Sequence, residues 1–245
     1  AVRDECRPHD EYVDREIDRT VAAATADYER FRFHRVVTEI RDLAGLLRQY
    51  RGYGAPHADV YRRGLRVLTR LVAPLTPYLG EEMWNLLRGD GIVADADWPE
   101  PDGDVEGYDI ERRLVRTLRE DVRDIFDVAN ITDAEEIEIA VAPDWKYRAH
   151  EIARSADAGG ALVGEIMGEE AVRAHGDDAQ SYAEDLAEQH QQLERILPPD
   201  EEYELLDRAS WLLRDEFDAE VTVRRAEEGE TAGKARPGKP AVHIR

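Results

Sequence analysis

The stretch that most constrains this chain is residues 61–84, YRRGLRVLTRLVAPLTPYLGEEMW. Its apolar residues recur at helical spacing and would line one face of an amphipathic helix: Tyr61, Leu65, Leu68 and Val72. Pro74 and Pro77 should end this helix, because proline lacks an N–H and disfavours helical geometry in the residue before it. Thr76 is a good cap for a second helix that begins at Pro77. The stretch therefore predicts a helix, a tight corner and another helix.

The same periodicity extends to either side of this corner. We expect helices at residues 11–28, 34–51, 58–73 and 77–88, which together make a helical bundle joined by short loops. A Gly-, Asp- and Pro-rich stretch, residues 89–107, then links this bundle to the next part, with Trp98 as its buried anchor. The most regular helix of the chain follows at residues 110–129 and joins the two parts.

The pattern changes in the second half of the chain. Residues 136–142, EIEIAVA, alternate strictly and predict a strand, and so do residues 219–225 and the closing PAVHIR. Between the strands we expect helices at residues 145–155 and near 161–174, 178–196 and 201–214. The fold class is therefore mainly α, with a helical bundle in residues 1–107 and a small α+β domain in residues 108–245.

Charge is the other strong constraint. The 245 residues hold 33 basic and 55 acidic side chains, a formal net charge of −22, and only three of the basic residues are lysines. Abundant carboxylates with almost no lysine resemble the cytoplasmic proteins of salt-loving archaea. Residues 30–70 are the exception, since ten arginines and three acidic residues give this window a net charge of +7. Such a basic island predicts a contact with a polyanion; the alternative is that these arginines pair with distant carboxylates.

Regular spacing singles out some of these cations as candidate RNA ligands. Arg41, Arg48 and Arg51 share a helix face with Gly45, whose small size would let a backbone phosphate approach or, alternatively, another helix pack. In the closing loop, residues 231–245 contain no acidic residue. The full set of candidate RNA-binding residues is Arg41, Arg48, Arg51, Arg62, Arg66, Arg70, Lys234, Arg236 and Lys239. The closing loop could instead be a solvated tail.

The phrase APLTPYLGEEMW, residues 73–84, resembles the proline-bracketed signature in the anticodon-binding helical domain of class Ia aminoacyl-tRNA synthetases. Tyr78 replaces the usual histidine and Gly80 the usual alanine, and WPE follows at residues 98–100 as in those enzymes. The strand followed by APDWKY and the closing KARPGKPAVHI resemble the C-terminal extension of archaeal-type leucyl-tRNA synthetases. Together the likeness covers most of the chain, least clearly at residues 157–191.

This resemblance implies a tRNA-recognition module of a leucine–tRNA ligase, the cytoplasmic enzyme that joins leucine to tRNA(Leu) at the expense of ATP. The bundle would lie along the tRNA body, and the α+β part would contact the long variable arm. Three alternatives remain: the tail of an isoleucyl, valyl or methionyl enzyme, an acidic scaffold that binds a basic protein, and a free-standing RNA-binding protein.

Catalytic chemistry is not expected within these residues. The H-I-G-H and K-M-S-K-S motifs of the family, which serve ATP, are both missing, so ATP and Mg would belong to a catalytic domain outside this chain. The editing domain is also expected elsewhere. The single cysteine, Cys6, excludes an internal disulfide and a cysteine-based zinc site, and the scattered histidines form no metal motif. No run of eighteen apolar residues predicts a membrane span.

Overall fold

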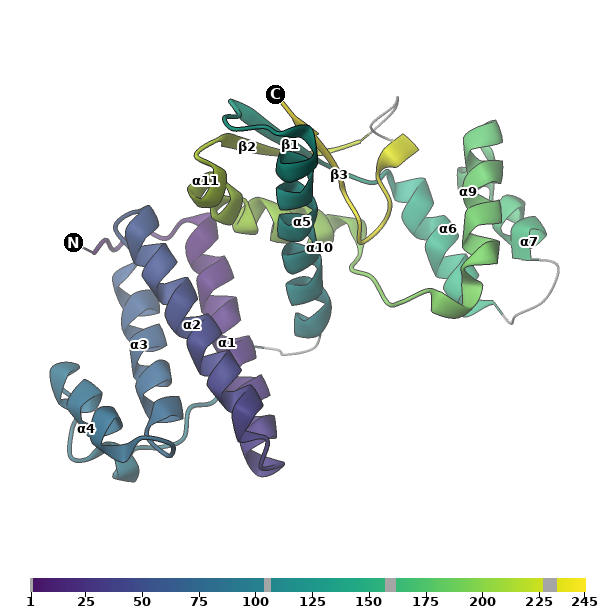
Figure 1. The fold of residues 1–245 in the computed structure, drawn as a ribbon. Helices are drawn as coiled ribbons and strands as arrows, with labels where there is room; N and C mark the ends of the chain where they lie inside the picture. Colours follow the sequence, from purple (N-terminus) through teal and green to yellow (C-terminus); the bar gives the residue numbers. More distant parts are fainter. Residues whose placement is uncertain (1, 104–106, 157–161, 227–232) are drawn as a thin grey trace. The chain divides into compact units, whose positions relative to one another are not determined.

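The computed structural model describes residues 2–103, 107–156, 162–226 and 233–245 (Figure 1). The chain divides into two compact units, Ala1–Tyr108 and Asp109–Arg245. The first unit is a bundle of helices, and the second combines helices with a three-stranded sheet. The predicted fold class, a helical bundle followed by a small α+β part, is confirmed.

Three long helices form the body of the bundle unit: α1 (Pro8–Glu29), α2 (Phe33–Tyr53) and α3 (Ala58–Val72). Each packs against the other two, and α4 (Pro77–Leu86) packs against α3 (Figure 1). Apolar side chains at helical spacing fill the centre, because burying one stripe of each helix removes it from water. The largest fully buried ones are Tyr50, Ile17, Leu43 and Leu71.

The corner between α3 and α4 forms where the two prolines predict it. A Cβ on Gly80 would lie 2.7 Å from the Cβ of Ala73, so only glycine allows this close approach. Thr76 does not cap α4 as expected; its hydroxyl donates back to the Val72 carbonyl oxygen at 3.3 Å. Glu81, within α4, has another contact: its carboxylate accepts a hydrogen bond from the Val93 N–H at 3.1 Å. This bond holds the short 3-10 helix Val93–Asp95 against α4.

Trp98 differs from the expectation of a buried anchor. Its side chain is 38% exposed, although its indole N–H donates to Thr25 Oγ1 at 2.8 Å. The buried tryptophan of this unit is Trp84, whose ring lies directly against Gly89. Most of residues 96–103 are exposed, and the Trp98 side chain meets the bundle through Tyr28 and Thr25.

The α+β unit begins with α5 (Tyr108–Ala129), at the boundary between the two units. Its sheet has the order β2-β1-β3, with β1 (Glu136–Val141) in the centre. Strand β2 (Glu220–Arg225) runs parallel to β1, and β3 (Ala241–Ile244) runs antiparallel to it. The three strands were predicted from their alternation, whereas their order was not.

The helices of this unit form two groups. Helices α10 (Pro199–Ala209) and α11 (Trp211–Phe217) contact the sheet, and Phe217 stacks on Phe126 of α5 with ring centroids 4.4 Å apart. A second apolar cluster, centred on Trp145, Ile166 and Tyr182, joins four helices. These are α6 (Asp144–Ser155), α7 (Leu162–Gly168), α8 (Glu170–Arg173) and α9 (Gly176–Glu188). The predicted helices near 161–174 and 201–214 are each divided in two, and a 3-10 turn, His190–Gln192, ends the one near 178–196.

Within the described ranges, no helix is both long enough and apolar enough to cross a lipid bilayer.

Candidate nucleic-acid interface

The arginines of α2 are open to solvent. Arg41, Arg48 and Arg51 are exposed, and none of them makes an ion pair or a hydrogen bond with another described residue. Gly45 is exposed on the same helix, and a Cβ there would meet nothing within 4 Å. Helix packing therefore does not explain Gly45, and the face beside it has room for an incoming group.

The arginines of α3 differ from one another. Arg66 is exposed and has no carboxylate partner among the described residues, whereas Arg62 pairs with Asp59 at 2.9 Å. Arg70 donates to the Asp97 carbonyl oxygen at 3.1 Å, and burial together with the neighbouring charge of Arg66 lowers its pKa. The Arg62–Asp59 pair is largely exposed, and such pairs contribute little because water screens them. The Arg62 guanidinium can therefore exchange the Asp59 carboxylate for a phosphate.

Arg63, which lies next in sequence to Arg62, has the opposite role. It binds the carboxylates of Asp14 at 2.6 Å and Asp102 at 2.8 Å, and it also binds Asp18. These contacts tie α3 to α1 and to the segment after α4. Arg63 was one of the ten arginines of the basic island but not a candidate ligand, and its contacts are structural.

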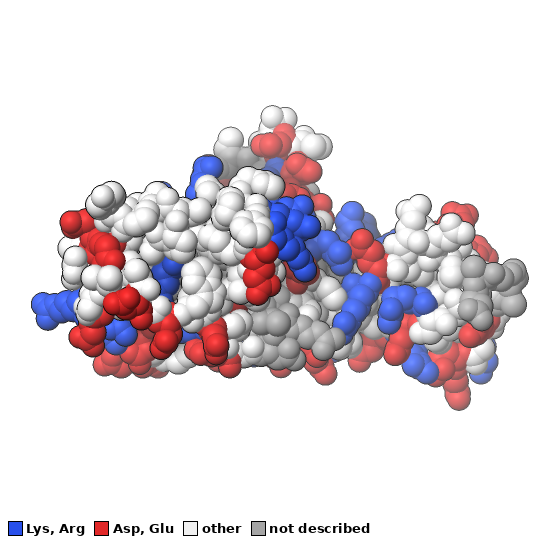
Figure 2. Space-filling view, turned by 90° about the horizontal axis from the view of Figure 1, so that it is seen from below, with Lys and Arg blue, Asp and Glu red and all other residues white. Residues whose placement is uncertain are grey.

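The candidate arginines thus form two separate lines, one on α2 and one on α3. The two helices are neighbours, since Tyr50 of α2 and Tyr61 of α3 have ring centroids 6.3 Å apart. Arg66 and Arg70 influence each other electrostatically, whereas no interaction between described residues joins the α2 line to the α3 line. Figure 2 shows one face of the molecule, on which basic side chains occur in separate groups among acidic ones. The candidate arginines Arg41, Arg48, Arg51 and Arg66 are therefore accessible, on two neighbouring helices.

The basic residues of the closing loop are held more firmly. Arg236 pairs with Asp185 at 2.5 Å, and its backbone forms a β-bridge with Lys239. The ammonium of Lys146, which is buried, donates to the carbonyl oxygens of Gly233 at 2.9 Å and Ala235 at 2.8 Å. Residues 233–239 are thus anchored to α6 and α9, and the alternative of a solvated tail is wrong for this part of the loop. Lys234 and Lys239 are both exposed.

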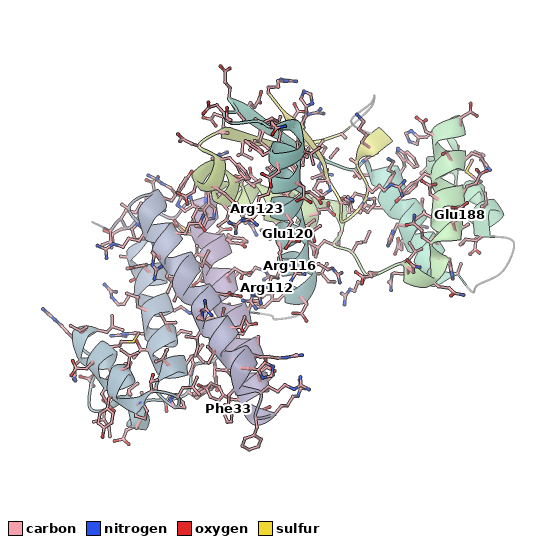
Figure 3. The ribbon with its side chains drawn as sticks, viewed as in Figure 1. Phe33, Arg112, Arg116, Glu120, Arg123 and Glu188 are labelled. Atoms are coloured by element: carbon pink, nitrogen blue, oxygen red, sulfur yellow. The ribbon has the colours of Figure 1, made fainter. Side chains whose placement is uncertain are left out.

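Three regularly spaced arginines of α5, Arg116, Arg119 and Arg123, lie close to carboxylates. Arg116 lies 4.0 Å from Glu120, one helical turn away. Glu216 of α11 binds Arg119 at 2.7 Å and also binds Arg123. Figure 3 shows Arg112, Arg116, Glu120 and Arg123 along α5. Although burial would raise the pKa of Glu216, the two guanidinium groups hold it below its usual value.

A cavity of about 320 Å³ lies in the α+β unit, between α5, the segment after α9 and the closing loop. Its lining includes His150 and Glu202, whose pKa values are both shifted by burial. Burial lowers the pKa of His150, whose ring nitrogen Nε2 lies 3.0 Å from the Glu194 carbonyl oxygen. Burial also raises the pKa of Glu202 to about 7, even though its carboxylate accepts a bond from the Gly238 N–H at 2.9 Å. Within the described ranges, no group of three or more His, Cys, Asp or Glu residues could hold a metal ion.

Comparison with known proteins matches the geometry to a family. The family model for the anticodon-binding domain of tRNA ligase matches residues 10–139, which include the bundle, α5 and part of β1. A leucine–tRNA ligase of Halobacterium salinarum is 42% identical over 239 residues, which cover 97% of this chain and 27% of that protein. Those of Aeropyrum pernix and Pyrococcus abyssi are 32% and 28% identical, over 96% and 98% of this chain. The chain spans about a quarter of the length of these relatives.

Proposed function

The chain belongs to the anticodon-binding-domain family of tRNA ligases, and from that premise we propose that it is the tRNA-recognition part of a leucine–tRNA ligase. The complete ligase would attach leucine to tRNA(Leu) with ATP, and the groups that bind ATP and Mg would lie in its catalytic domain. Such a role in protein synthesis would place the chain in the cytoplasm. The proposal is supported by leucine–tRNA ligases that match nearly the whole chain.

One observation carries the physical argument for RNA binding. In a chain with a net charge of −22, four arginines on two neighbouring helices are exposed and have no carboxylate partner in the described chain. They are Arg41, Arg48, Arg51 and Arg66. An exposed guanidinium presents several N–H donors in a plane, which suits the oxygens of a phosphate. We therefore propose that these arginines contact the sugar–phosphate backbone, together with Arg62 and Arg70.

The closing loop is a second proposed contact, with the variable arm of the tRNA. Its anchoring by Lys146 and by the Arg236–Asp185 pair supports a rigid surface rather than a flexible one. Lys234 and Lys239 are exposed candidates for phosphates there, whereas Arg236 would first have to leave Asp185.

The test compares the double variant Arg48→Gln/Arg66→Gln with wild type in filter binding to tRNA(Leu) over a range of salt concentrations. Each lost phosphate contact should reduce the slope of log affinity against log salt by about one. We therefore expect weaker binding and a slope smaller by about two. The control is Arg208→Gln, which removes a surface arginine already paired with Glu204 at 3.1 Å. It should leave both affinity and slope unchanged.

An unchanged slope in the double variant would remove α2 and α3 from the RNA footprint. Binding of a basic peptide by wild type, with no binding of tRNA, would favour the protein-scaffold alternative. Competition between tRNA species with long and short variable arms tests the specificity: only the long-armed species should compete if the closing loop recognises that arm.

A further inference from the structure

An exposed aromatic and basic segment joins α1 to α2. Residues 30–35 read RFRFHR, and Phe31, Arg32, Phe33, His34 and Arg35 are all exposed. The ring of Phe31 is 78% exposed and that of Phe33 45% exposed. Figure 3 shows Phe33 at the end of the bundle unit where α1 and α2 meet. Two adjacent phenyl rings in water are costly for a soluble bundle, so their exposure needs a reason.

The backbone at Phe31 is also unusual. Its φ is +55°, in the left-handed region, directly after the end of α1. This is the position where helices commonly end on glycine, because a side chain makes that conformation unfavourable. The other described non-glycine residues with positive φ are Arg88, Asn130 and Asp218, and asparagine and aspartate tolerate it best. A bulky ring that is strained and 78% exposed gains little from packing, which points to a functional role.

The two rings extend an ordered aromatic series outward from the bundle. Phe31 and Phe33 have centroids 6.1 Å apart, Phe33 and Tyr28 6.2 Å, and Tyr28 and Trp98 5.3 Å, all edge to face. Tyr28 is fixed because its hydroxyl donates to the Leu71 carbonyl oxygen at 2.6 Å. The inner rings are therefore anchored, and they orient the outer two.

Positive charge surrounds these rings. Arg30 and Arg35 are exposed and have no ion-pair partner in the described part of the chain, and Arg32 lies 3.8 Å from Asp27. Glu29 is the single acidic residue in residues 28–38. The first turn of α2 has no side-chain cap, so its N-terminal dipole adds to the positive potential. Aromatic faces between arginines are the combination that binds single-stranded nucleic acid, by stacking on bases and attracting phosphates.

We propose that Phe31 and Phe33 form a stacking platform for unpaired nucleotides of the bound RNA, with Arg30 and Arg35 on the adjoining phosphates. This inference rests on the proposed function and adds to it a contact with bases. Paired bases within a duplex present their faces to one another, so the platform selects loops or ends rather than helical stems.

The test measures binding of the tRNA(Leu) transcript to the full chain and to Phe31→Gly, Phe33→Ala and Phe31→Trp. Loss of one stacked ring should weaken binding about tenfold while leaving the salt slope unchanged, because no phosphate contact is lost. Phe31→Gly should at the same time raise the melting temperature by a few degrees, since glycine accepts the left-handed backbone. Phe31→Trp should bind at least as tightly as wild type. The control is Tyr78→Ala, which removes an aromatic ring of the same unit that is 91% exposed.

Short oligouridylate and a blunt RNA duplex of equal length serve as competitors. Oligouridylate should displace a tRNA fragment from wild type but not from the double variant Phe31→Gly/Phe33→Ala. The duplex should displace the fragment to the same extent from wild type and from the double variant. Equal tRNA affinity of wild type and the ring variants would overturn the platform while leaving the proposed function in place. If wild type bound no RNA at all, the proposed function would fail and the platform with it. A change in sedimentation of the ring variants, with unaltered RNA binding, would assign the rings to a protein contact and also overturn the proposal.

Discussion

The bundle unit and the α+β unit both bury charged side chains, and they stabilise them in different ways. In the bundle, buried charges meet opposite charges: Asp10 binds Arg3 at 2.6 Å, and Arg19 binds Glu39 at 2.9 Å. In the α+β unit, Lys146 and Glu202 are buried against backbone groups of the same closing loop. The pairs keep their members charged, whereas the backbone contacts leave the desolvation of Lys146 and Glu202 only partly offset.

This difference shows in the pKa values. Burial would raise the pKa of Asp10, but hydrogen bonds from Arg3, Tyr50 and the Arg7 N–H bring it below its usual value. In the other unit, burial lowers the pKa of Lys146 to about 8 and raises that of Glu202 to about 7. The bundle should therefore respond to acid, and the α+β unit to pH near neutrality. The comparison also predicts which charges can be replaced by neutral groups.

The largest effect is expected from breaking a bundle pair. Asp10→Ala would leave Arg3 and the buried hydroxyl of Tyr50 without this partner, and breaking a buried pair costs about 3–5 kcal/mol of unfolding free energy. Because the pKa of Asp10 is lowered on folding, its stabilisation is present above its unfolded pKa and is lost as pH falls through the folded value. Urea unfolding of wild type and variant over a range of pH measures the loss of unfolding free energy and its pH dependence. Hydrogen exchange in α1 and α2 locates the loss in the bundle. A loss below 1 kcal/mol would show that the pair contributes little.

Glu202→Gln should have the opposite sign. A carboxyl with a pKa of about 7 when folded, against an ordinary value of 4.5, contributes stability that is present below pH 4.5 and lost as pH rises through 7. At about 1.4 kcal/mol per pH unit, the glutamine variant should be more stable than wild type by about 3 kcal/mol at pH 8. At pH 4 the difference should vanish. Urea unfolding at both pH values is the measurement, and equal gains at both would contradict the assignment to this carboxyl.

Lys146→Met should have the smallest effect. The substitution removes a cation whose pKa is lowered by burial, which is favourable, and it also removes the bonds to the Gly233 and Ala235 carbonyl oxygens. Since these contributions oppose each other, we expect the stability at pH 7 to change by no more than about 1 kcal/mol. Thermal unfolding of the variant beside Asp10→Ala makes the comparison direct. A loss as large as that of Asp10→Ala would mean that single buried charges are as indispensable as pairs.

Much of the fold could be predicted because it is encoded locally. The helix predicted at 110–129 is observed as Tyr108–Ala129, and the strand predicted at 136–142 as Glu136–Val141. Apolar residues with period 3.6 or 2 specify such elements whatever they pack against. The parallel pairing of β1 with β2 has no local signal, since it depends on which distant segments meet. The exposure of Trp98 was missed for the same reason.

In the candidate site, too, local features could be predicted from the sequence and contacts between distant segments could not. Helical spacing placed Arg41 and Arg48 on an open face and left Arg63 outside the candidate set, but it could not show that Arg63 meets carboxylates from two other segments. The pairing of Arg236 with Asp185 likewise joins residues 51 positions apart. The exposure of Phe31 did have a signal in the sequence, because a phenylalanine stands where a helix would usually end in glycine.

The position of β1 in its sheet has a consequence for how the chain acquires its structure. Both neighbours of β1 come from residues 220–244, so β1 is made well before either partner strand. The three long helices of the bundle, by contrast, contact one another within residues 8–72, so they can pack together as soon as α3 has emerged from the ribosome. Distant pairing is slow because a long segment must lose its freedom before any bond rewards it. During synthesis, therefore, α1, α2 and α3 would be complete while β1 still lacks both of its partner strands.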